Sequence, residues 1–257
     1  MKVVILAGGY GTRLSEYTES IPKPMVKIGD IPIIMHIMNI YASYGFKDFC
    51  IALGYKGNII KEFFINYSRN SKDFQIDLGS GEINFLNKKT NLDWKVTLID
   101  TGQDSLTGRR VKLLKPYLNG ERFFLTYGDG LSNINLHTLL EFHKNHGKLF
   151  TMTAVRPPAR FGELSINSNF DVNSFKEKPQ LNQGWINGGF FVVESDFLDL
   201  ITERNVMLER EPLEELTNTN NLKAFKHEGF WQCMDTIRDK KLLETLYEQG
   251  APWIINQ

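Results

Sequence analysis

The feature that most restricts the fold is the alternation of short apolar runs with amphipathic segments over the first 150 residues. Several runs are apolar at consecutive positions, which is typical of strands covered by helices on both faces. The runs of strand length are "KVVILA", "DFCIALG", "KVTLIDT", "RFFLTYGD" and "FTMTAV". Helical periodicity lies between them, in 32–44, 58–68, 108–118 and 135–147. The alternation predicts an α/β fold, a Rossmann-like mixed and mostly parallel sheet flanked by helices.

Two regions interrupt this alternation. Residues 70–94 are polar with weak alternation, which predicts a small β insertion, a hairpin or flap, within the sheet. Beyond residue 156, the short strand-like runs "GELSIN", "DVNSFKEK" and "WINGGFFVVE" precede two helical patterns, giving a β/helical C-terminal portion. We expect a single domain over 1–257, with halves of different pattern at 1–155 and 156–257.

The overall charge excludes whole classes of partner. The chain carries 30 acidic and 30 basic residues, so no net field draws it to nucleic acid or to an anionic membrane. No run approaches the roughly 20 apolar residues that cross a bilayer, and no signal peptide precedes the first strand, which predicts a cytoplasmic protein. Cys50 and Cys233 lack metal or redox spacing and are expected to be buried free thiols. The histidines offer no zinc set and are expected at the surface or as helix caps.

A glycine-rich turn follows the first strand in "LAGGYGTRL", residues 6–14. Gly8, Gly9 and Gly11 let backbone N–H groups approach a bound anion without interference from Cβ atoms, and Arg13 supplies a cation beside them. A Walker loop would need Gly-Lys-Ser/Thr, and a dinucleotide fingerprint would need a small residue at Leu14. Neither pattern fits, and a plain strand-to-helix turn is the alternative.

Lys23 and two aspartates are candidate site residues, although each also has an ordinary structural explanation. Lys23 lies between two prolines in "IPKPM", which hold the backbone extended, and is either a phosphate contact or a solvated lysine. Asp129 follows a strand, where open α/β sheets bind ligands, but Asp-Gly is also a hairpin turn signal. Asp235 precedes Thr236 and a helical pattern, as a helix cap or first-turn charge does.

Three further segments contain candidate residues. Arg109 and Arg110 open a helix, where positive charge opposes the helix dipole, and an anionic ligand would resolve the conflict. Gly188 and Gly189 lie within the apolar run "INGGFFVV", which indicates either close approach of a ligand or a bulge. Lys178 precedes a proline and so has a defined extended backbone, unless it lies in a solvated turn beside Glu177.

Taken together, these motifs resemble the sugar-1-phosphate nucleotidyltransferases, or pyrophosphorylases, over nearly the whole chain. "LAGGYGTRL", "PKPM", "DTGQDSLTGRR", "TYGDG", "RFGEL", "FKEKP", "INGGFFV" and "FWQCMDT" occur in the family's order. The resemblance implies the GT-A-like nucleotidyltransferase fold, with 1–155 mainly binding nucleotide and 156–257 mainly binding sugar phosphate. The motifs are most similar to members that transfer a cytidylyl group from CTP to glucose 1-phosphate, which implies these two small-molecule substrates and Mg²⁺.

The resemblance also assigns roles to residues. It implies nucleotide binding by Leu6, Ala7, Gly8, Gly9, Tyr10, Gly11, Thr12, Arg13, Lys23, Thr107, Arg110 and Gly128, and sugar-phosphate binding by Glu177, Lys178, Asn187, Gly188 and Gly189. It implies Asp129 and Asp235 as the Mg²⁺ ligands, and Arg13, Lys23, Asp129, Lys178 and Asp235 as the catalytic set. Arg109 stands where the family often has a small residue, so its role stays open.

In the implied reaction, the sugar-phosphate oxygen attacks the α-phosphorus of CTP in line and expels pyrophosphate. The family is generally oligomeric, which implies a homo-oligomer joined through "GFFVVESDFLDLI" or "APWII". The alternatives are the same reaction with UTP or dTTP, a non-catalytic nucleotide sensor, and a nicotinamide dehydrogenase, which Leu14 disfavours.

Overall fold

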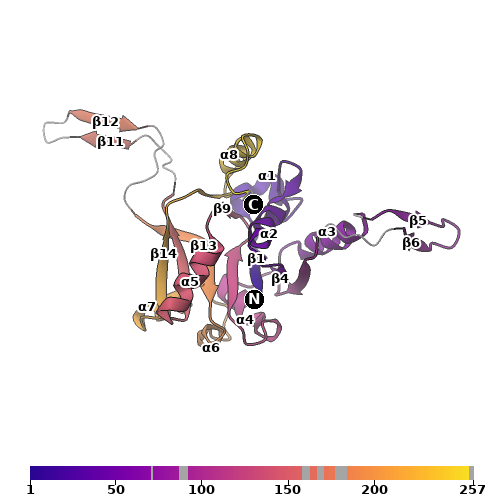
Figure 1. Cartoon of the computed structure of the whole chain (residues 1–257), viewed down its shortest axis with the longest axis horizontal. Helices are drawn as coiled ribbons and strands as arrows, with labels where there is room; N and C mark the ends of the chain where they lie inside the picture. The colour runs from indigo at the N-terminus through magenta and orange to yellow at the C-terminus, as the bar shows by residue number, and fades with distance from the viewer. Residues whose placement is uncertain (71, 87–91, 158–162, 167–170, 177–183, 255–257) are drawn as a thin grey trace.

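The computed structural model describes the chain except residues 71, 87–91, 158–162, 167–170, 177–183 and 255–257. Within the described residues the centre is a seven-stranded sheet with the order β14-β10-β13-β8-β1-β4-β7 (Figure 1). β13 runs antiparallel to both of its neighbours, and the other pairs are parallel. The strands of this sheet are β1 (Val3–Ala7), β4 (Asp48–Leu53), β7 (Lys95–Asp100), β8 (Phe123–Tyr127), β10 (Phe150–Val155), β13 (Ile186–Val193) and β14 (Leu222–His227). The predicted fold class, a mixed and mostly parallel sheet, is confirmed.

Helices cover both faces of this sheet. One face packs against α2 (Ile33–Ser43), α3 (Gly57–Asn70), α5 (Leu136–His146) and α8 (Ile237–Glu248). The other packs against α4 (Thr107–Leu113), α6 (Phe197–Leu200) and α7 (Glu211–Asn218). Successive side chains of β1 alternate between the two cores, with Val3 and Ile5 in one and Val4 and Leu6 in the other. Burial on both faces explains why the strand sequence is apolar at every position.

Short elements connect and extend this framework. They are the helix α1 (Ser15–Thr18), the 3₁₀ turns η1 (Thr12–Leu14), η2 (Lys23–Met25) and η3 (Lys115–Tyr117), and the strand pairs β2 (Lys27–Ile28) with β3 (Ile31–Pro32), β5 (Phe74–Ile76) with β6 (Ile83–Phe85), β9 (Gly130–Ser132) with β15 (Trp231–Cys233), and β11 (Glu163–Ile166) with β12 (Val172–Lys176). The hairpin β5–β6 lies beyond the end of α3 and projects from the body (Figure 1), so the predicted insertion within 70–94 is confirmed.

The sequence interpretation missed β14. We expected only helical patterns after β13, but Leu222–His227 extends the sheet as an edge strand parallel to β10. Its sequence "LKAFKH" places lysines at an exposed edge, where charged side chains discourage pairing with other chains. An edge strand of this kind lacks the continuous apolar run that identified the central strands.

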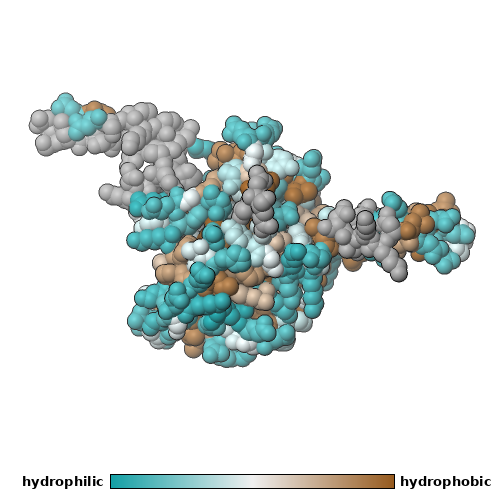
Figure 2. Space-filling model, viewed as in Figure 1, coloured by the Kyte–Doolittle hydropathy of each residue, from teal (hydrophilic) through white to brown (hydrophobic). Residues whose placement is uncertain are grey.

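The apolar segments proposed for subunit contacts are largely internal. Phe191, Val193, Phe197, Leu198 and Trp253 are each at most 1% exposed. Exposed apolar side chains occur instead on the hairpin β5–β6, where brown surface is visible on the projecting arm (Figure 2). Among the helices that the structure describes, none combines the length and apolarity needed to span a bilayer.

Two histidines contradict the expectation of surface or capping positions. His36 and His143 are 3% and 1% exposed. His36 Nε2 lies 2.9 Å from the carbonyl oxygen of Ile28, and His143 Nδ1 lies 2.7 Å from Thr151 Oγ1. Both imidazoles are therefore interior groups, satisfied by hydrogen bonds. Cys50 is buried as expected, while Cys233 is only half-buried.

His143 should make the stability of the protein depend on pH. Burial lowers its pKa to about 4, against the partial opposing effect of Glu194, which lies 3.1 Å away. The unfolded chain takes up this proton near pH 6.5, so the free energy of unfolding falls as pH drops from about 6.5 to about 4. Between pH 7 and pH 5 we expect the wild type to lose roughly 2 kcal/mol more than His143→Gln in urea unfolding. Equal losses in the two proteins would contradict this assignment.

Candidate active site

The glycine turn lies at the carboxyl edge of the sheet. β1 ends at Ala7, and the chain turns through Gly8–Gly11 into η1, with Gly11 in the left-handed region at φ 64°. The carboxyl ends of β4, β7 and β8 reach the same edge because these strands run parallel to β1. This is where open α/β sheets bind ligands, and the turn therefore stands in the position that the sequence predicted.

Arg110 holds this turn in place from behind. Its guanidinium donates 2.7–3.0 Å hydrogen bonds to five oxygens, the carbonyls of Gly8, Leu53, Gly102 and Gln103 and the hydroxyl of Thr101. The residue is 3% exposed, and burial lowers the pKa of Arg110. Carbonyl oxygens thus supply the negative partners that we expected from an anionic ligand, and the residue ties three strand ends together.

Lys23 forms the charged centre of the site. Its Nζ lies 2.5 Å from Asp129 Oδ2 and 2.6 Å from Asp235 Oδ1, and its side chain is 13% exposed. Burial lowers the pKa of Lys23, but the charges of and hydrogen bonds to the two aspartates raise it by more, so the pKa lies above its ordinary value. Pro22 is extended as predicted, whereas Lys23 itself begins the 3₁₀ turn η2 and is not extended.

The two aspartates meet because β9 and β15 pair. Each carboxylate flanks one of these strands, and the N–H of Met234 donates to the carbonyl of Asp129 at 2.8 Å. β9 pairs with β15 and not with β8, so Asp129 does not lie in a hairpin turn. This pairing joins positions more than 100 residues apart in the chain.

Asp235 is likewise free of the capping role that we considered. Thr236 caps α8, in a capping box with Asp239. Burial raises the pKa of Asp235, but Lys23 and Arg13 lower it by more, leaving that pKa below its ordinary value. Arg13 NH1 lies 2.9 Å from Asp235 Oδ2, with the arginine side chain 69% exposed. The carboxylate therefore serves the charged centre and not the helix.

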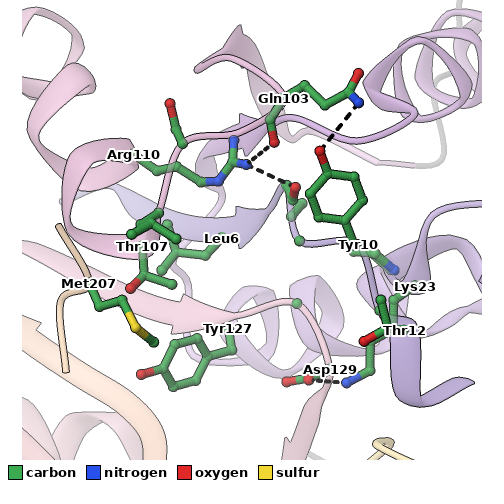
Figure 3. Close-up of a pocket in the computed structure, with 18 of the residues that line it drawn as sticks. Leu6, Tyr10, Thr12, Lys23, Gln103, Thr107, Arg110, Tyr127, Asp129 and Met207 are labelled. Carbon is green, nitrogen blue, oxygen red and sulfur yellow. Dashed lines mark hydrogen bonds and ion pairs between the residues drawn. The ribbon is translucent and has the colours of Figure 1, made fainter. Parts of the chain in front are cut away.

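Two hollows meet at this charged centre. The first, of about 400 Å³, is lined by every residue for which the resemblance implied nucleotide binding, from Leu6–Arg13 and Lys23 to Thr107, Arg110 and Gly128 (Figure 3). The second, of about 900 Å³, includes Asn187, Gly188 and Gly189 in its lining. Both contain Arg13, Tyr127, Asp129 and Asp235. Two ligands could therefore lie end to end, with their adjoining groups beside the aspartates.

The sugar-phosphate residues are only partly visible. Glu177 and Lys178 lie outside the described residues. Asn187 donates through Nδ2 to the Tyr127 hydroxyl at 3.1 Å and accepts from the N–H of Gly189 at 2.9 Å. Gly188 and Gly189 lie at the register shift between β13 and β10, where 188–190 face residue 153 alone, in agreement with the bulge interpretation.

Protein packing explains both of these glycines. A Cβ at Gly188 would lie 2.7 Å from Val155 Cγ1, and one at Gly189 would lie 2.6 Å from the ring of Tyr127. Gly189 also adopts a φ of +78°, which L side chains rarely adopt.

Several residues of the site were not among our candidates. Tyr127 forms part of the wall of both hollows, and its hydroxyl donates a hydrogen bond to Glu209. Trp231 Nε1 donates to the carbonyl of Gly188 at 2.7 Å. Asp104, at the rim, accepts a hydrogen bond from the hydroxyl of Tyr10 at 2.5 Å. Tyr127 could have been found from its place at a strand end, whereas nothing in the local sequence marks Glu209.

Comparison with known proteins agrees with this geometry. The family model described as nucleotidyl transferase matches residues 2–236. The chain belongs to the nucleotidyl transferase family. This nucleotidyl transferase is 49% identical over 255 residues to a glucose-1-phosphate cytidylyltransferase of Salmonella typhimurium, covering 98% of both chains. It is 41% identical over 251 residues to a probable glucose-1-phosphate cytidylyltransferase of Bacillus subtilis, covering 97% of both.

A solved structure supports the same fold. HddC from Yersinia pseudotuberculosis matches this nucleotidyl transferase with a TM-score of 0.71 at 24% identity, covering 96% of this chain and 99% of that one.

Replacing Gly8 with alanine should lower stability, whereas replacing Gly9 with alanine should weaken nucleotide binding. A Cβ at Gly8 would lie 2.4 Å from the guanidinium of Arg110, whereas one at Gly9 meets nothing within 4 Å and enters the first hollow. Gly8→Ala should therefore displace a buried cation and lower Tm by about 4 °C or more. Gly9→Ala should leave Tm unchanged but weaken nucleotide binding, measured as a smaller rise in Tm with CTP and Mg²⁺. Equal losses of Tm in the two variants would contradict this division.

Proposed function

We propose that this protein transfers a cytidylyl group from CTP to α-D-glucose 1-phosphate, releasing pyrophosphate and forming CDP-glucose. The observation that carries the proposal is the meeting of two hollows at Lys23, Asp129 and Asp235, one lined by the glycine turn and the other by Asn187 and its neighbours. The 49% identity to a glucose-1-phosphate cytidylyltransferase over 98% of the chain supports the choice of substrates.

The chemistry needs alignment and charge neutralisation more than proton transfer. The attacking phosphate oxygen of glucose 1-phosphate is already ionised at neutral pH, so no general base is required. Lys23, at the junction of the hollows, neutralises the α-phosphate of CTP, and Arg13, exposed at the rim, holds the β- and γ-phosphates. Such fixed cations stabilise the charge that grows on the transferring group and on pyrophosphate. We assign the phosphate of the sugar to Lys178.

Mg²⁺ fits this donor set. Asp129 and Asp235 direct carboxylate oxygens at one point, where the Lys23 ammonium now supplies the positive charge. Within the part of the chain that the structure describes, no group of three or more His, Cys, Asp or Glu side chains gathers to hold a metal alone. Mg²⁺ commonly binds through one or two carboxylates and completes its ligands with substrate phosphates and water. When bound, it supplies positive charge between the reacting phosphates.

The remaining features of the site divide between the substrates. The first hollow receives the nucleotide, with its phosphates toward Lys23 and Gly8–Gly11 around them. The second receives the sugar, with Asn187, Gly188 and Gly189 near its hydroxyls and Glu177 beside them. These substrates are cytoplasmic metabolites, and we place the enzyme in the cytoplasm.

A pyrophosphate-release assay tests the proposal. With glucose 1-phosphate and Mg²⁺, CTP should give the highest initial rate among CTP, UTP, dTTP and GTP. Lys23→Ala should lower kcat by about 10²–10³, the loss typical of one preorganised charge-stabilising contact. Lys27→Ala, in the exposed position of β2, is the matched control and should keep the wild-type rate. Faster turnover of UTP or dTTP would reassign the nucleotide, and near-normal turnover in a folded Lys23→Ala protein would refute the role of Lys23.

We further propose that the enzyme assembles into a homo-oligomer through the hairpin β5–β6. Register pairs Phe74 with Phe85 and Ile76 with Ile83, so these four side chains share one face, each 43–46% exposed. The four side chains are apolar, with the Lys72 ammonium 5.2 Å from the centre of the Phe85 ring, and a second copy of the same face would complement it across a two-fold axis.

Two substitutions on opposite faces of this hairpin test the assembly. Phe74→Ser with Phe85→Ser should lower the molar mass measured by light scattering. Gln75→Ser with Asn84→Ser, on the other face, should leave the mass unchanged. An unchanged mass in the phenylalanine variant would exclude this surface.

A further inference from the structure

The segment Asn205–Glu209, between α6 and α7, covers the beginning of α4. The carbonyl of Val206 accepts from the N–H groups of Gly108 and Arg109, at 3.0 and 3.3 Å. Asn205 Oδ1 accepts from the N–H of Leu106 at 2.7 Å. A Cβ at Gly108 would lie 2.9 Å from the Val206 oxygen, so glycine permits this close approach. The amides that open α4 are thus used by the protein itself.

Glu209 ends this segment with its carboxylate between two hydroxyl groups. Oε2 accepts from Thr107 Oγ1 at 2.6 Å, and Oε1 accepts from the Tyr127 hydroxyl at 2.5 Å. The Tyr127 oxygen in turn accepts from Asn187 Nδ2 at 3.1 Å. Each link has a fixed direction, because the carboxylate only accepts and the NH₂ group of Asn187 only donates. The chain of bonds therefore runs from Asn187 through Tyr127 to Glu209.

This chain of bonds connects the two hollows. Thr107 lines the first hollow, Asn187 lines the second, and Tyr127 lines both. Figure 3 shows Tyr127 below Thr107, between Met207 and Asp129. Burial and the charge of Glu209 both raise the pKa of Tyr127, so its hydroxyl keeps the proton that it donates. With its hydroxyl engaged at both donor and acceptor positions, Tyr127 presents its ring to the hollows as a fixed wall.

We infer that Glu209 is a positioning residue, which orients Tyr127 and Asn187 and so sets the sugar-phosphate subsite relative to the nucleotide subsite. The inference rests on the proposed function for the names of the substrates, but the bond chain itself does not depend on them. Glutamine at this position has one oxygen acceptor instead of two, and its NH₂ group would face a hydroxyl that must donate. One link would then break while the size of the side chain is kept.

Steady-state kinetics test the catalytic consequence. Glu209→Gln should lower kcat/KM for glucose 1-phosphate about 10-fold or more, mainly through KM, as expected when a hydrogen bond to a charged group is lost. Tyr127→Phe should cause a similar loss, and the losses in the double variant should not add, because both substitutions disturb the same chain of hydrogen bonds. Glu211→Gln is the matched control, since that exposed carboxylate accepts from Arg204 at 3.0 Å. Normal kinetics in Glu209→Gln, or additive losses in the double variant, would overturn the inference.

A second measurement separates this inference from the proposed reaction. The side-chain amide resonance of Asn187, identified with Asn187→Asp, should shift in Glu209→Gln and in Tyr127→Phe without any ligand, and should not shift in Glu211→Gln. Circular dichroism and Tm of each variant establish that it is folded. If the wild type turns over no sugar phosphate, the proposed function fails while the resonance still tests the bond chain. An unshifted resonance in both folded variants would overturn the inference whatever the enzyme's substrates.

Discussion

The contact of Lys23 with Asp129 and Asp235 is the interaction on which the site depends. The lysine lies 106 and 212 positions from its partners, at 2.5 and 2.6 Å. Two half-buried carboxylates so close together would repel each other, and such a pair is stable only with a cation between them. Lys23 provides that cation, and Arg13 balances the remaining charge on Asp235. Substrate phosphates and a divalent ion would meet beside these two carboxylates. In the protein without ligands, Lys23 and Arg13 already neutralise the carboxylates, and the bound ion would take over part of that role.

A molecule without net charge can still prepare a site for polyanions, because the relevant positive charge is local. Arg110 illustrates how this charge is managed. A guanidinium buried behind the glycine turn would be costly without partners, and here carbonyl oxygens and a hydroxyl surround it. The residue lines the first hollow but is only 3% exposed. Gly8 has no Cβ because the guanidinium occupies that space, which links a sequence motif to a packing requirement.

The sequence predicts a structural feature well when the residues that define the feature are neighbours in the chain. The buried strands were predictable because each side chain of β1 enters one of two cores, and this leaves an unbroken apolar run. The glycine turn was predictable because a cluster of glycines after a strand is itself the mark of a tight turn. The edge strand β14 was not, since its lysines face solvent and only its pairing with β10 defines it. Arg110 was a candidate and lines the first hollow, but its carbonyl partners come from three separate segments, which no local pattern reveals. Glu209 escaped notice for the same reason, because its partners lie 82 and 102 positions away.

The direction of β13 explains why the site lies along one edge of the sheet. Parallel strands deliver their carboxyl ends to this edge, and with them the glycine turn and Asp129. β13 runs the other way, so its amino end, with Asn187 and Gly188, reaches the same edge directly beside Tyr127 of β8. A parallel strand in this place would carry those residues to the opposite edge, beyond reach of the aspartates. One reversed strand thus brings the second hollow against the first, and Gly189, within the bulge of this strand, lets the backbone pass close to the ring of Tyr127.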